Sequence, residues 1–418
     1  MASTEYDLII IGGGLAGASL AVALAKTNYR IAVIEAFAVD ADAQPSYDER
    51  TIALTYSARH IFSQLGVWDS QIEADACAIK SIHISNKGHL GLSRLSCLDA
   101  GTPALGYVVP TRSLGYALTR QIQLSDNIAF YCPGEASQVD IKAHAAVVTV
   151  LTDKAKKPLE LSAKLVVIAD GGRSPLLSRL GFNKEQHPYS QSALLSIIST
   201  NTAHQNKAYE RFMDDGPLAL LPMTDQRFAV VWTLSPENLT RIEAMDDMDY
   251  IACLQDAFGT TAGLFSKPTS RKAYPLTRSI LNTPYGERVL VLGNAAHTVH
   301  PVAGQGFNLG LRDVAALAEQ LLESEQDISD IGSLAFLQHY AQSRTQDTQR
   351  VSQFTDGLLK IFSHSSPLVA AGRNLGLAVV ENLPFVKRAL LRHSMGLGKG
   401  QPRLARGLKL RRGRSSES

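Results

Sequence analysis

Cysteine is scarce in this chain, with only four among 418 residues: Cys77, Cys97, Cys132 and Cys253. No two of them form a CxxC pair, and their spacing does not match a metal site. Disulfides belong mainly to oxidising compartments, so these cysteines are expected to be reduced thiols. The start, MASTEYDLII, lacks a basic segment followed by an apolar core and a cleavage site. We therefore expect a cytoplasmic protein without a secretory signal.

Motifs of several enzyme classes are also missing. The sequence has no HExxH pattern for a zinc protease and no GxSxG elbow for a hydrolase. One uncharged run, from Leu8 to Ala25, has the 18 residues of a candidate membrane span. It contains four glycines, which weaken helices and favour turns. The run is better interpreted as a strand, a tight turn and a buried helix.

Charge of either sign is sparse, with 19% charged residues and a net charge of +2, and no nucleic acid is expected as a partner. The distribution is uneven, because residues 387–414 hold ten Lys or Arg and no Asp or Glu. Of the 41 basic residues, 31 remain for the rest of the chain, against 39 acidic ones. A mildly acidic body with a basic tail predicts an anionic surface as partner.

A glycine-rich turn lies near the N-terminus, in YDLIIIGGGLAGASLAVALAKTNYRIAVIE. The segment predicts a strand, a turn with Gly12, Gly14 and Gly17 in GxGxxG spacing, a helix and a second strand that ends at Glu35. The glycines allow a tight turn, close approach of a pyrophosphate and close helix–strand packing. The helix N-terminus attracts phosphate, and the carboxylate of Glu35 can bind a ribose hydroxyl. This pattern predicts a dinucleotide site for FAD or NAD.

Two later segments repeat the change from strand to turn. KLVVIADGGRS is an apolar strand ending at Asp170, and RVLVLGN is a second one ending at Gly293 and Asn294. After the latter, GQGFNLGLRDVAALAEQLLE predicts a glycine turn that opens an amphipathic helix. The N-terminus of that helix is expected to face an electron-rich group.

In order and spacing, these three segments resemble the signatures of the single-component FAD aromatic hydroxylases. YDERTIAL, VVPTRSL and HPVAGQGFNLGLRDV are similar to the ubiquinone-biosynthesis branch of that family, and most similar to its hydroxylases of 2-polyprenyl-6-methoxyphenol. The resemblance covers about residues 5–365. It implies an α/β fold with a Rossmann-like FAD-binding domain of the para-hydroxybenzoate hydroxylase type, an interleaved β-sheet substrate domain and a helical C-terminal tail.

The resemblance also implies a set of cofactor-binding residues: Gly12, Gly14, Gly17, Glu35, Arg50, Arg112, Asp170, Gly293, Asn294, Gly304, Gln305, Gly306 and Asn308. The first three glycines would hold the pyrophosphate, and the stretch from Gly304 onward would face the flavin ring with backbone N–H groups. Most of the wider family has Gly-Asp where this chain has Gly293-Asn294, so the ribityl contact would be uncharged. That departure favours the quinone-hydroxylase branch.

Two histidines, His297 and His300, are three residues apart, a spacing that suits a metal or an acid–base pair. No further metal motif accompanies them, and no metal is expected. The catalytic residue that activates the phenol is not identified; His300 and Pro301 are the candidates beside the ring.

Domain boundaries follow from the resemblance and from apolar strands such as LALLPM and RFAVVWTL. Residues 1–75, 105–182 and 283–365 are expected to form the FAD-binding domain, 76–104 and 183–282 the substrate domain, and 366–418 a tail. In the tail, Leu383, Phe385, Val386, Leu390 and Leu391 could enter a membrane interface. Lys387, Arg388 and Arg392 would then meet lipid headgroups, as a peripheral anchor on the inner face of the cytoplasmic membrane.

The resemblance implies hydroxylation of 2-polyprenyl-6-methoxyphenol to 2-polyprenyl-6-methoxy-1,4-benzoquinol, with FAD as cofactor, NADH or NADPH as transient reductant and O2 as co-substrate. Three alternatives stay open. The chain could hydroxylate another ring position, reduce prenyl double bonds, or serve mainly as a scaffold among other quinone-biosynthesis proteins.

Overall fold

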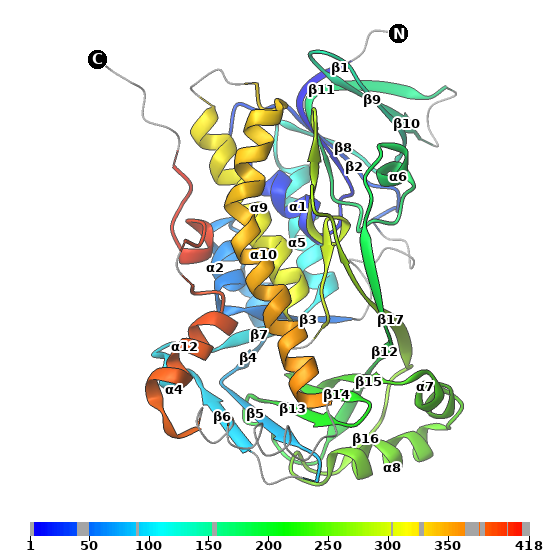
Figure 1. Cartoon of the computed structure of the whole chain (residues 1–418), viewed down its shortest axis with the longest axis vertical. Helices are drawn as coiled ribbons and strands as arrows, with labels where there is room; N and C mark the ends of the chain where they lie inside the picture. The colour runs from blue at the N-terminus through cyan, green and yellow to red at the C-terminus, as the bar shows by residue number, and fades with distance from the viewer. Residues whose placement is uncertain are drawn as a thin grey trace.

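The computed structural model contains three β-sheets and a layer of long helices (Figure 1). It describes residues 4–39, 50–88, 92–152, 157–301, 304–325, 330–363, 376, 381–398 and 400–411, with side chains left out for 4, 5 and 359–363. In Figure 1 one sheet lies at the top, a second at the bottom, and helices α9 (Gln305–Ser324) and α10 (Leu334–Ser363) run between them.

The upper sheet has eight strands, and its centre is parallel in the order β19-β11-β1-β2-β8. Crossover helices cover parallel strands. The carboxyl-terminal halves of these strands are accordingly buried and apolar, at residues 8–11, 31–34, 165–168 and 289–291. The hairpin of β9 and β10 extends β11, and β18 pairs with β19. The strands are β1 (Thr4–Ile11), β2 (Ile31–Ile34), β8 (Ile128–Tyr131), β9 (Glu135–Ile141), β10 (Ala146–Leu151), β11 (Leu159–Ile168), β18 (Tyr285–Gly286) and β19 (Val289–Val291).

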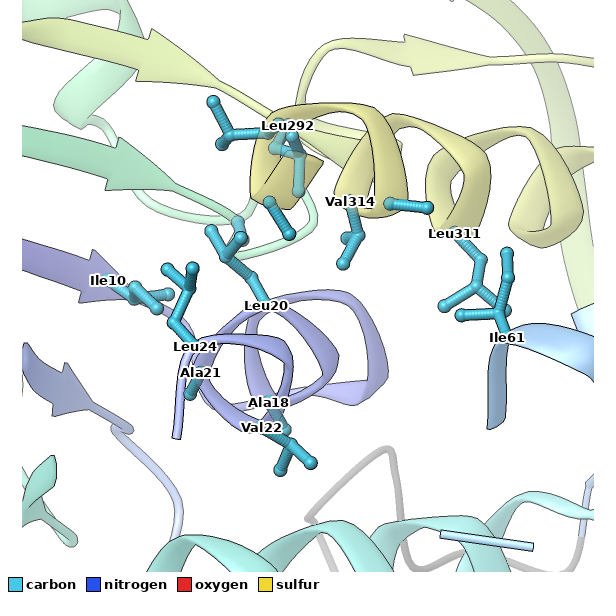
Figure 2. Packing of buried hydrophobic residues seen from close by; sticks show 14 of the residues in the cluster. Ile10, Ala18, Leu20, Ala21, Val22, Leu24, Ile61, Leu292, Leu311 and Val314 are labelled. Carbon is cyan, nitrogen blue, oxygen red and sulfur yellow. The ribbon is translucent and has the colours of Figure 1, made fainter. Parts of the chain in front are cut away.

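Three helices pack on one face of this sheet: α1 (Leu15–Ala23), α5 (Thr111–Gln123) and α9. Figure 2 shows Leu20 of α1 and Val314 of α9 in the space between the two helices. Both side chains are completely buried. Burial of each such side chain stabilises the fold by roughly 1.5–3 kcal/mol, so this layer fixes where α1 and α9 begin. The short helix α6 (Leu176–Arg179) lies on the other face.

The lower sheet has nine strands, eight of them in the order β20-β17-β12-β15-β14-β13-β5-β6, while β16 pairs with β12. All its pairings are antiparallel except that of β13 with β5. The strands are β5 (Ser81–Asn86), β6 (Leu92–Ser96), β12 (Glu185–Thr200), β13 (Lys207–Met213), β14 (Gly216–Met223), β15 (Arg227–Leu234), β16 (Phe265–Ser266), β17 (Lys272–Ile280) and β20 (His297–Thr298).

The two faces of the lower sheet have different neighbours. Helices α7 (Pro236–Glu243) and α8 (Asp247–Phe258) pack on one face, where Leu218 and Leu220 of β14 are completely buried. Because side chains alternate along a strand, Pro217, Ala219 and Leu221 lie on the opposite face. A three-stranded sheet packs at the edge of that second face, and it contains β3 (Thr51–Thr55), β4 (Cys77–Ile79) and β7 (Gly106–Pro110).

Around this small sheet lie helices α2 (Tyr56–Gln64), α3 (Ser70–Asp75), α4 (Cys97–Ala100), α12 (Pro384–Ser394) and the short turn η3 (Leu404–Arg406). The short turn η1 (Gly293–Ala295) follows β19 of the upper sheet. Helix α12 lies beside α4, at the lower left of Figure 1. Its Leu391 is completely buried against Leu95 and Cys97, and its Lys387 pairs with Asp99 at 3.3 Å. Leu391 and Lys387 are therefore docked on the body, which corrects their expected place in a membrane interface.

The predicted α/β fold is confirmed. The strand, turn and helix at the N-terminus, the strands at LALLPM and RFAVVWTL, and the long helix after Gly304 all occur. The proposed domain ranges stay a prediction. Within the described residues no helix is long and apolar enough to cross a bilayer. Residues 366–375, 377–380, 399 and 412–418 of the predicted tail lie outside the described residues.

Candidate functional site

Four of the predicted site segments meet at one edge of the upper sheet. Gly12 follows β1, Glu35 follows β2, Asp170 follows β11 after one residue, and Gly293 follows β19 after one residue. These four strands are neighbours and parallel, so their carboxyl ends lie side by side. The carboxyl edge of a parallel sheet is where such folds bind ligands. Segments up to 281 residues apart in sequence thus form one edge.

The first turn requires glycine for steric reasons. Gly12 has a φ of +103°, and a Cβ there would lie 2.7 Å from the backbone carbon of Ala169. At Gly17 a Cβ would overlap the carbonyl oxygen of Gly12. No larger residue could keep β1, β11 and α1 this close. Because glycine has no side chain, the backbone of the turn is open to a ligand, and a pyrophosphate can approach it closely.

Two helices begin at this edge without a side-chain cap. The N-cap of α1 is Gly14 and that of α9 is Gly304, and at neither helix start does a capping side chain accept a hydrogen bond from the backbone N–H groups. The first N–H groups of an α-helix have no partner within the helix and carry partial positive charge. Both helix starts can therefore bind an anion or an electron-rich ring edge.

Acidic side chains at the edge order the turns around them. One oxygen of Glu35 accepts a hydrogen bond from the N–H of Gly13 at 2.7 Å, and the other accepts from Phe37 at 3.0 Å. Burial raises the pKa of Glu35, although these hydrogen bonds act in the opposite direction. Asp170 accepts from the N–H of Gly172 at 2.7 Å and from the hydroxyl of Ser174. Asp170 therefore stabilises the conformation of the loop from Asp170 to Ser174.

A cleft of about 1360 Å³ runs from this edge to the lower sheet. Pockets for one drug-sized ligand measure roughly 300–1,000 Å³, so the cleft has room for a dinucleotide and a second molecule. The predicted site residues that line it are Gly12, Gly14, Glu35, Arg50, Asp170, Gly293, Asn294, Pro301, Gly304, Gln305 and Gly306. Gly17, Arg112, His300 and Asn308 do not line it.

Asn308 holds helix α9 on strand β3. Its side chain is completely buried, accepts a hydrogen bond from the N–H of Thr55 at 2.8 Å and donates to the carbonyl oxygen of Ala53 at 2.8 Å. Any part that Asn308 has in cofactor binding is therefore indirect. Gln305 donates to the carbonyl oxygen of Ser394 at 3.2 Å and so connects α9 to α12. Arg112 is exposed on α5 outside the cleft.

Arg50 and Asn294 do face the cleft. The guanidinium of Arg50 lies 5.3 Å from the ring centre of Tyr274 on β17, a cation–π contact between the small sheet and the lower sheet. The backbone of Arg50 accepts the N–H of Thr111 at 2.9 Å. Asn294 is exposed and lines the cleft beside α9, so its amide can bind a ligand hydroxyl.

The two histidines have separate surroundings. His297 is hydrogen-bonded at 2.5 Å to Asp313, which also accepts from Arg344 at 2.6 Å. Burial alone would raise the pKa of Asp313. The nearby Arg344 and His297 outweigh this effect, so the pKa of Asp313 lies below its usual value. His300 packs edge-on against Tyr189, and burial lowers the pKa of its ring to about 4, so it is neutral at neutral pH.

Metal binding by these histidines would require further ligands beside them. In the part of the chain that the structure describes, no group of three or more His, Cys, Asp or Glu side chains is placed to hold a metal ion. His300 and Pro301 line a smaller pocket of about 270 Å³ next to the main cleft. The role of His300 and Pro301 as candidates beside the ring stays a prediction.

The residues that form the floor of the cleft were not predicted from the sequence. This floor is the open face of the lower sheet, with Ala193, Leu195, Ala208, Glu210, Phe212, Ala219, Leu221 and Val231. Helix α12 closes one end with Leu390 and Met395. The strands were expected, but the sequence does not say which face of each strand is open. Glu210, in KAYERFM, was therefore not recognised.

The upper part of the cleft fits FAD. It offers a bare glycine turn, two uncapped helix starts and a carboxylate at the end of β2, within one groove. These are the groups that bind a pyrophosphate, a ribose and an electron-rich ring edge. When bound, FAD supplies redox chemistry with a nicotinamide reductant and O2.

Comparison with known proteins agrees with this geometry. The family model described as "FAD binding domain" matches residues 5–355. A "Ubiquinone hydroxylase UbiL" from Rhodospirillum rubrum is 32% identical over 97% of this chain and 93% of its own length. The "3-demethoxyubiquinol 3-hydroxylase" of Escherichia coli is 29% identical over 95% of this chain and its full length, 100%.

Solved structures show the same fold. The p-nitrophenol 4-monooxygenase PnpA from Pseudomonas putida superposes with a TM-score of 0.77 at 16% identity, over 94% of this chain and 99% of that one. PqsL of P. aeruginosa, in complex with 2-aminobenzoylacetate, gives 0.74 at 19% identity, over 90% and 100%.

The matched model spans most of the chain, and relatives named as ubiquinone hydroxylases align over nearly all of it, so the expected resemblance, enzyme class and FAD cofactor are confirmed. The chain belongs to the ubiquinone-hydroxylase family of FAD-dependent monooxygenases.

Proposed function

We propose that this protein hydroxylates a polyprenylated phenol in ubiquinone biosynthesis, converting 2-polyprenyl-6-methoxyphenol to 2-polyprenyl-6-methoxy-1,4-benzoquinol. The observation that carries the proposal is the continuity of the cleft, which leads from the glycine turn of Gly12 to an apolar floor on the lower sheet and on to helix α12. A phenol ring with a long apolar chain matches such a floor in shape and polarity.

In this proposal, different groups along the cleft bind different parts of FAD and the phenol. Gly12 and Gly14, with the start of α1, bind the pyrophosphate, and Glu35 binds the adenosine ribose. Asn294 binds the ribityl chain, and the N–H groups from Gly304 onward face the flavin ring. The lower sheet holds the phenol against that ring and excludes water, which keeps the reacting atoms in line.

The relatives raise one specific alternative. The E. coli relative is named for 3-hydroxylation of 3-demethoxyubiquinol, so the same cleft could serve another ring position in the same pathway. Ring position depends on how the floor orients the phenol. Deleting the gene and identifying the quinone precursor that accumulates separates the two. Accumulation of 2-polyprenyl-6-methoxyphenol supports the proposal, and accumulation of a precursor already hydroxylated at that position contradicts it.

Purified enzyme tests the reaction class. With FAD bound and NADH or NADPH supplied, the phenol should increase O2 consumption and yield a hydroxylated product in matching amounts. A prenyl reductase would instead consume reductant without O2, and a scaffold would do neither.

A second proposal concerns how the substrate enters. We propose that the α4–α12 corner rests on the membrane, because Leu98 of α4 is 86% exposed and Phe385 of α12 is 70% exposed. The ion pair of Lys387 with Asp99 joins the two helices at this corner. Arg388 and Arg392 are exposed on α12, where they can meet anionic headgroups. The cleft ends beneath the same helix at Leu390, so a prenyl chain could pass directly from the bilayer.

Sedimentation with phosphatidylglycerol vesicles tests this second proposal. Removing one inserted aromatic or leucine side chain costs roughly 1.5–3 kcal/mol of binding, so the double variant Leu98→Ser, Phe385→Ser should bind vesicles at least about tenfold more weakly. Met248→Ser is the control, because Met248 is 83% exposed but lies on α8. Equal binding of the double variant and the wild type would contradict the proposal.

A further inference from the structure

One carboxyl group lies on the apolar floor of the cleft. Glu210 is the central residue of β13, and it lines the cleft together with Ala208 and Phe212 of the same strand. Its cross-strand neighbours are Ile84 on β5 and Ala219 on β14. Both neighbours also line the cleft, so the carboxyl group stands within a patch of hydrocarbon.

Other charged groups in the cleft belong to its upper part. In the described structure the charged residues that line the cleft are Glu35, Arg50, Glu135, Asp170, Arg173 and Glu210. Glu35, Glu135, Asp170 and Arg173 come from strands of the upper sheet or the turns that follow them. Arg50 lies over Tyr274 on β17. Strand β17 is four strands away from β13, about 19 Å at the usual strand spacing.

The carboxyl group of Glu210 is unpaired among the described residues. Across the residues that the structure describes, no hydrogen bond or ion pair reaches its carboxyl group, and burial alone raises its pKa to about 7. An unpaired carboxylate in an apolar site is costly, and natural proteins rarely retain one without a use. A perturbed carboxyl group in a cleft is a frequent mark of a functional site. The missing partner is expected to arrive with a ligand.

We infer that Glu210 accepts the hydroxyl proton of the phenol ring. The inference rests on the proposed function. As the phenol binds, its O–H donates a hydrogen bond to the carboxylate of Glu210. During hydroxylation the O–H bond breaks, the proton joins a carboxylate oxygen, and the bonding electron pair stays on the phenol oxygen. That electron density raises the nucleophilicity of the ring carbon para to the hydroxyl, which is the carbon that receives oxygen.

A carboxylate at this position would also orient the phenol ring on the floor of the cleft. An apolar floor binds the prenyl chain but does not orient the ring. A single acceptor on that floor fixes the hydroxyl, and with it the carbon that faces the flavin. Glu210 thereby sets both the reactivity and the ring position of the substrate.

Catalysis by the holoenzyme gives the first test, with the near-isosteric variant Glu210→Gln. A positioned base contributes about 10²–10⁴-fold, so kcat should fall at least a hundredfold while KM changes little. In the wild type kcat/KM should rise with pH through an ionisation near 7, and the variant should lack it. Glu237→Gln, exposed on α7, is the control and should leave both unchanged.

Other titratable groups near Glu210 do not obscure this profile. The described cleft-lining residues of the neighbouring elements β5, β6, β14, α10 and α12 carry no carboxyl, imidazole or amine group: Ile82, Ile84, Ser93, Leu95, Pro217, Ala219, Leu221, Phe354, Leu358, Leu390, Ser394 and Met395. On β13 itself Tyr209 is titratable, and burial raises the pKa of its hydroxyl. An ionisation near 7 that vanishes in Glu210→Gln therefore belongs to Glu210.

Binding without turnover gives the second test, with a short-chain prenyl phenol and its O-methyl ether as probes. The ether cannot donate a hydrogen bond, so the wild-type holoenzyme should prefer the phenol by about tenfold to a hundredfold at pH 8. In Glu210→Leu the preference should fall close to one. The bound flavin's absorbance reports on folding and on binding of each probe.

The outcomes separate the inference from the proposed function. If neither probe binds the wild type, the proposed function is wrong and the inference with it. If the phenol binds and is hydroxylated, but Glu210→Gln keeps the wild-type kcat and pH profile, only the inference is wrong.

Discussion

The two ends of the cleft are built from different parts of the chain. At the upper end the ligand-facing surface is backbone: the turn at Gly12, the start of α1 at Gly14 and the start of α9 at Gly304. At the lower end the surface is side chains on an open sheet face, such as Leu195, Ala219 and Glu210. A backbone surface has little freedom to change with sequence, whereas a side-chain surface can change at each position. The difference explains how one fold keeps a single cofactor and accepts different aromatic substrates.

The largest effect is expected from a methyl group at the upper end. Gly12→Ala places a Cβ 2.7 Å from the backbone of Ala169, at a φ of +103° that alanine rarely adopts. Since β1 and β11 are both buried, neither can move aside. The variant should purify without FAD, or bind it at least a hundredfold more weakly, as measured by flavin absorbance and titration.

Gly66→Ala is the matched control for that substitution. Gly66 also has a positive φ, +72°, but a Cβ there would meet nothing within 4 Å. It should lower the free energy of unfolding by about 1–2 kcal/mol and leave FAD binding intact. Similar loss of FAD in both variants would mean that backbone strain, and not the shape of the turn, determines binding.

A large side chain at the lower end should have the opposite pattern. Ala219→Phe extends a ring into the cleft from β14, so FAD should stay bound while kcat/KM for the phenol falls about tenfold to a hundredfold. Leu220→Ala, on the other face of the same strand, should cost about 2–5 kcal/mol of stability without changing substrate affinity. Loss of FAD from Ala219→Phe would contradict the division between the two ends.

The difference between a backbone surface and a side-chain surface also determines what could be predicted from the sequence. The upper end follows from spacing, because glycines that need a positive φ and apolar strands that end in turns leave a pattern along the chain. Gly12, Asp170 and Gly293 could be placed at one edge since parallel strands align their carboxyl ends. The side chains that hold this edge in position could not be identified from the sequence. Asn308 looks like a cofactor ligand in sequence, but its amide bonds to Thr55 and Ala53.

The lower end leaves no such pattern. Along β13 the side chains alternate between two faces, and both faces contain apolar and polar side chains: Ala208, Glu210 and Phe212 on one, Tyr209 and Arg211 on the other. Only the tertiary structure shows that α8 covers the second face, where Phe258 packs against Tyr209 and Arg211. A glutamate that would be solvated on an exposed face is thus placed inside a cleft.

A smaller effect is expected in stability when Glu210 loses its charge. Burial raises the pKa of Glu210 to about 7, above the value of about 4.3 for an unfolded glutamate. The folded state therefore holds the proton more tightly, and the wild type loses stability as pH rises from about 4.3 to 7. Glu210→Gln should be more stable than the wild type by about 1–3 kcal/mol at pH 8, and by much less at pH 5.

Denaturant unfolding of the holoenzyme at the two pH values checks this sign. Glu237 is exposed in the first turn of α7, so Glu237→Gln should cost at most about 1 kcal/mol, and nearly the same at both pH values. A stability gain of equal size at pH 5 and pH 8 would show that packing of the amide, and not removal of a buried charge, is responsible.

The smallest effect is expected at Asn294, where backbone and side-chain surfaces meet. The residue follows Gly293 and lines the cleft with an exposed amide. Asn294→Asp keeps an oxygen acceptor of the same reach, so a ribityl hydroxyl can still donate to it. The added charge lies near the start of α1, because the adjacent Gly293 approaches Ala16 in its first turn. It is favourable there, but it also lies near an anionic cofactor, where it is not. Because these terms oppose each other, FAD affinity should change by less than about tenfold, or about 1.4 kcal/mol. A larger loss, measured by flavin titration, would mean that the amide N–H donates to the cofactor, and the upper end would then depend on a side chain as well as on backbone.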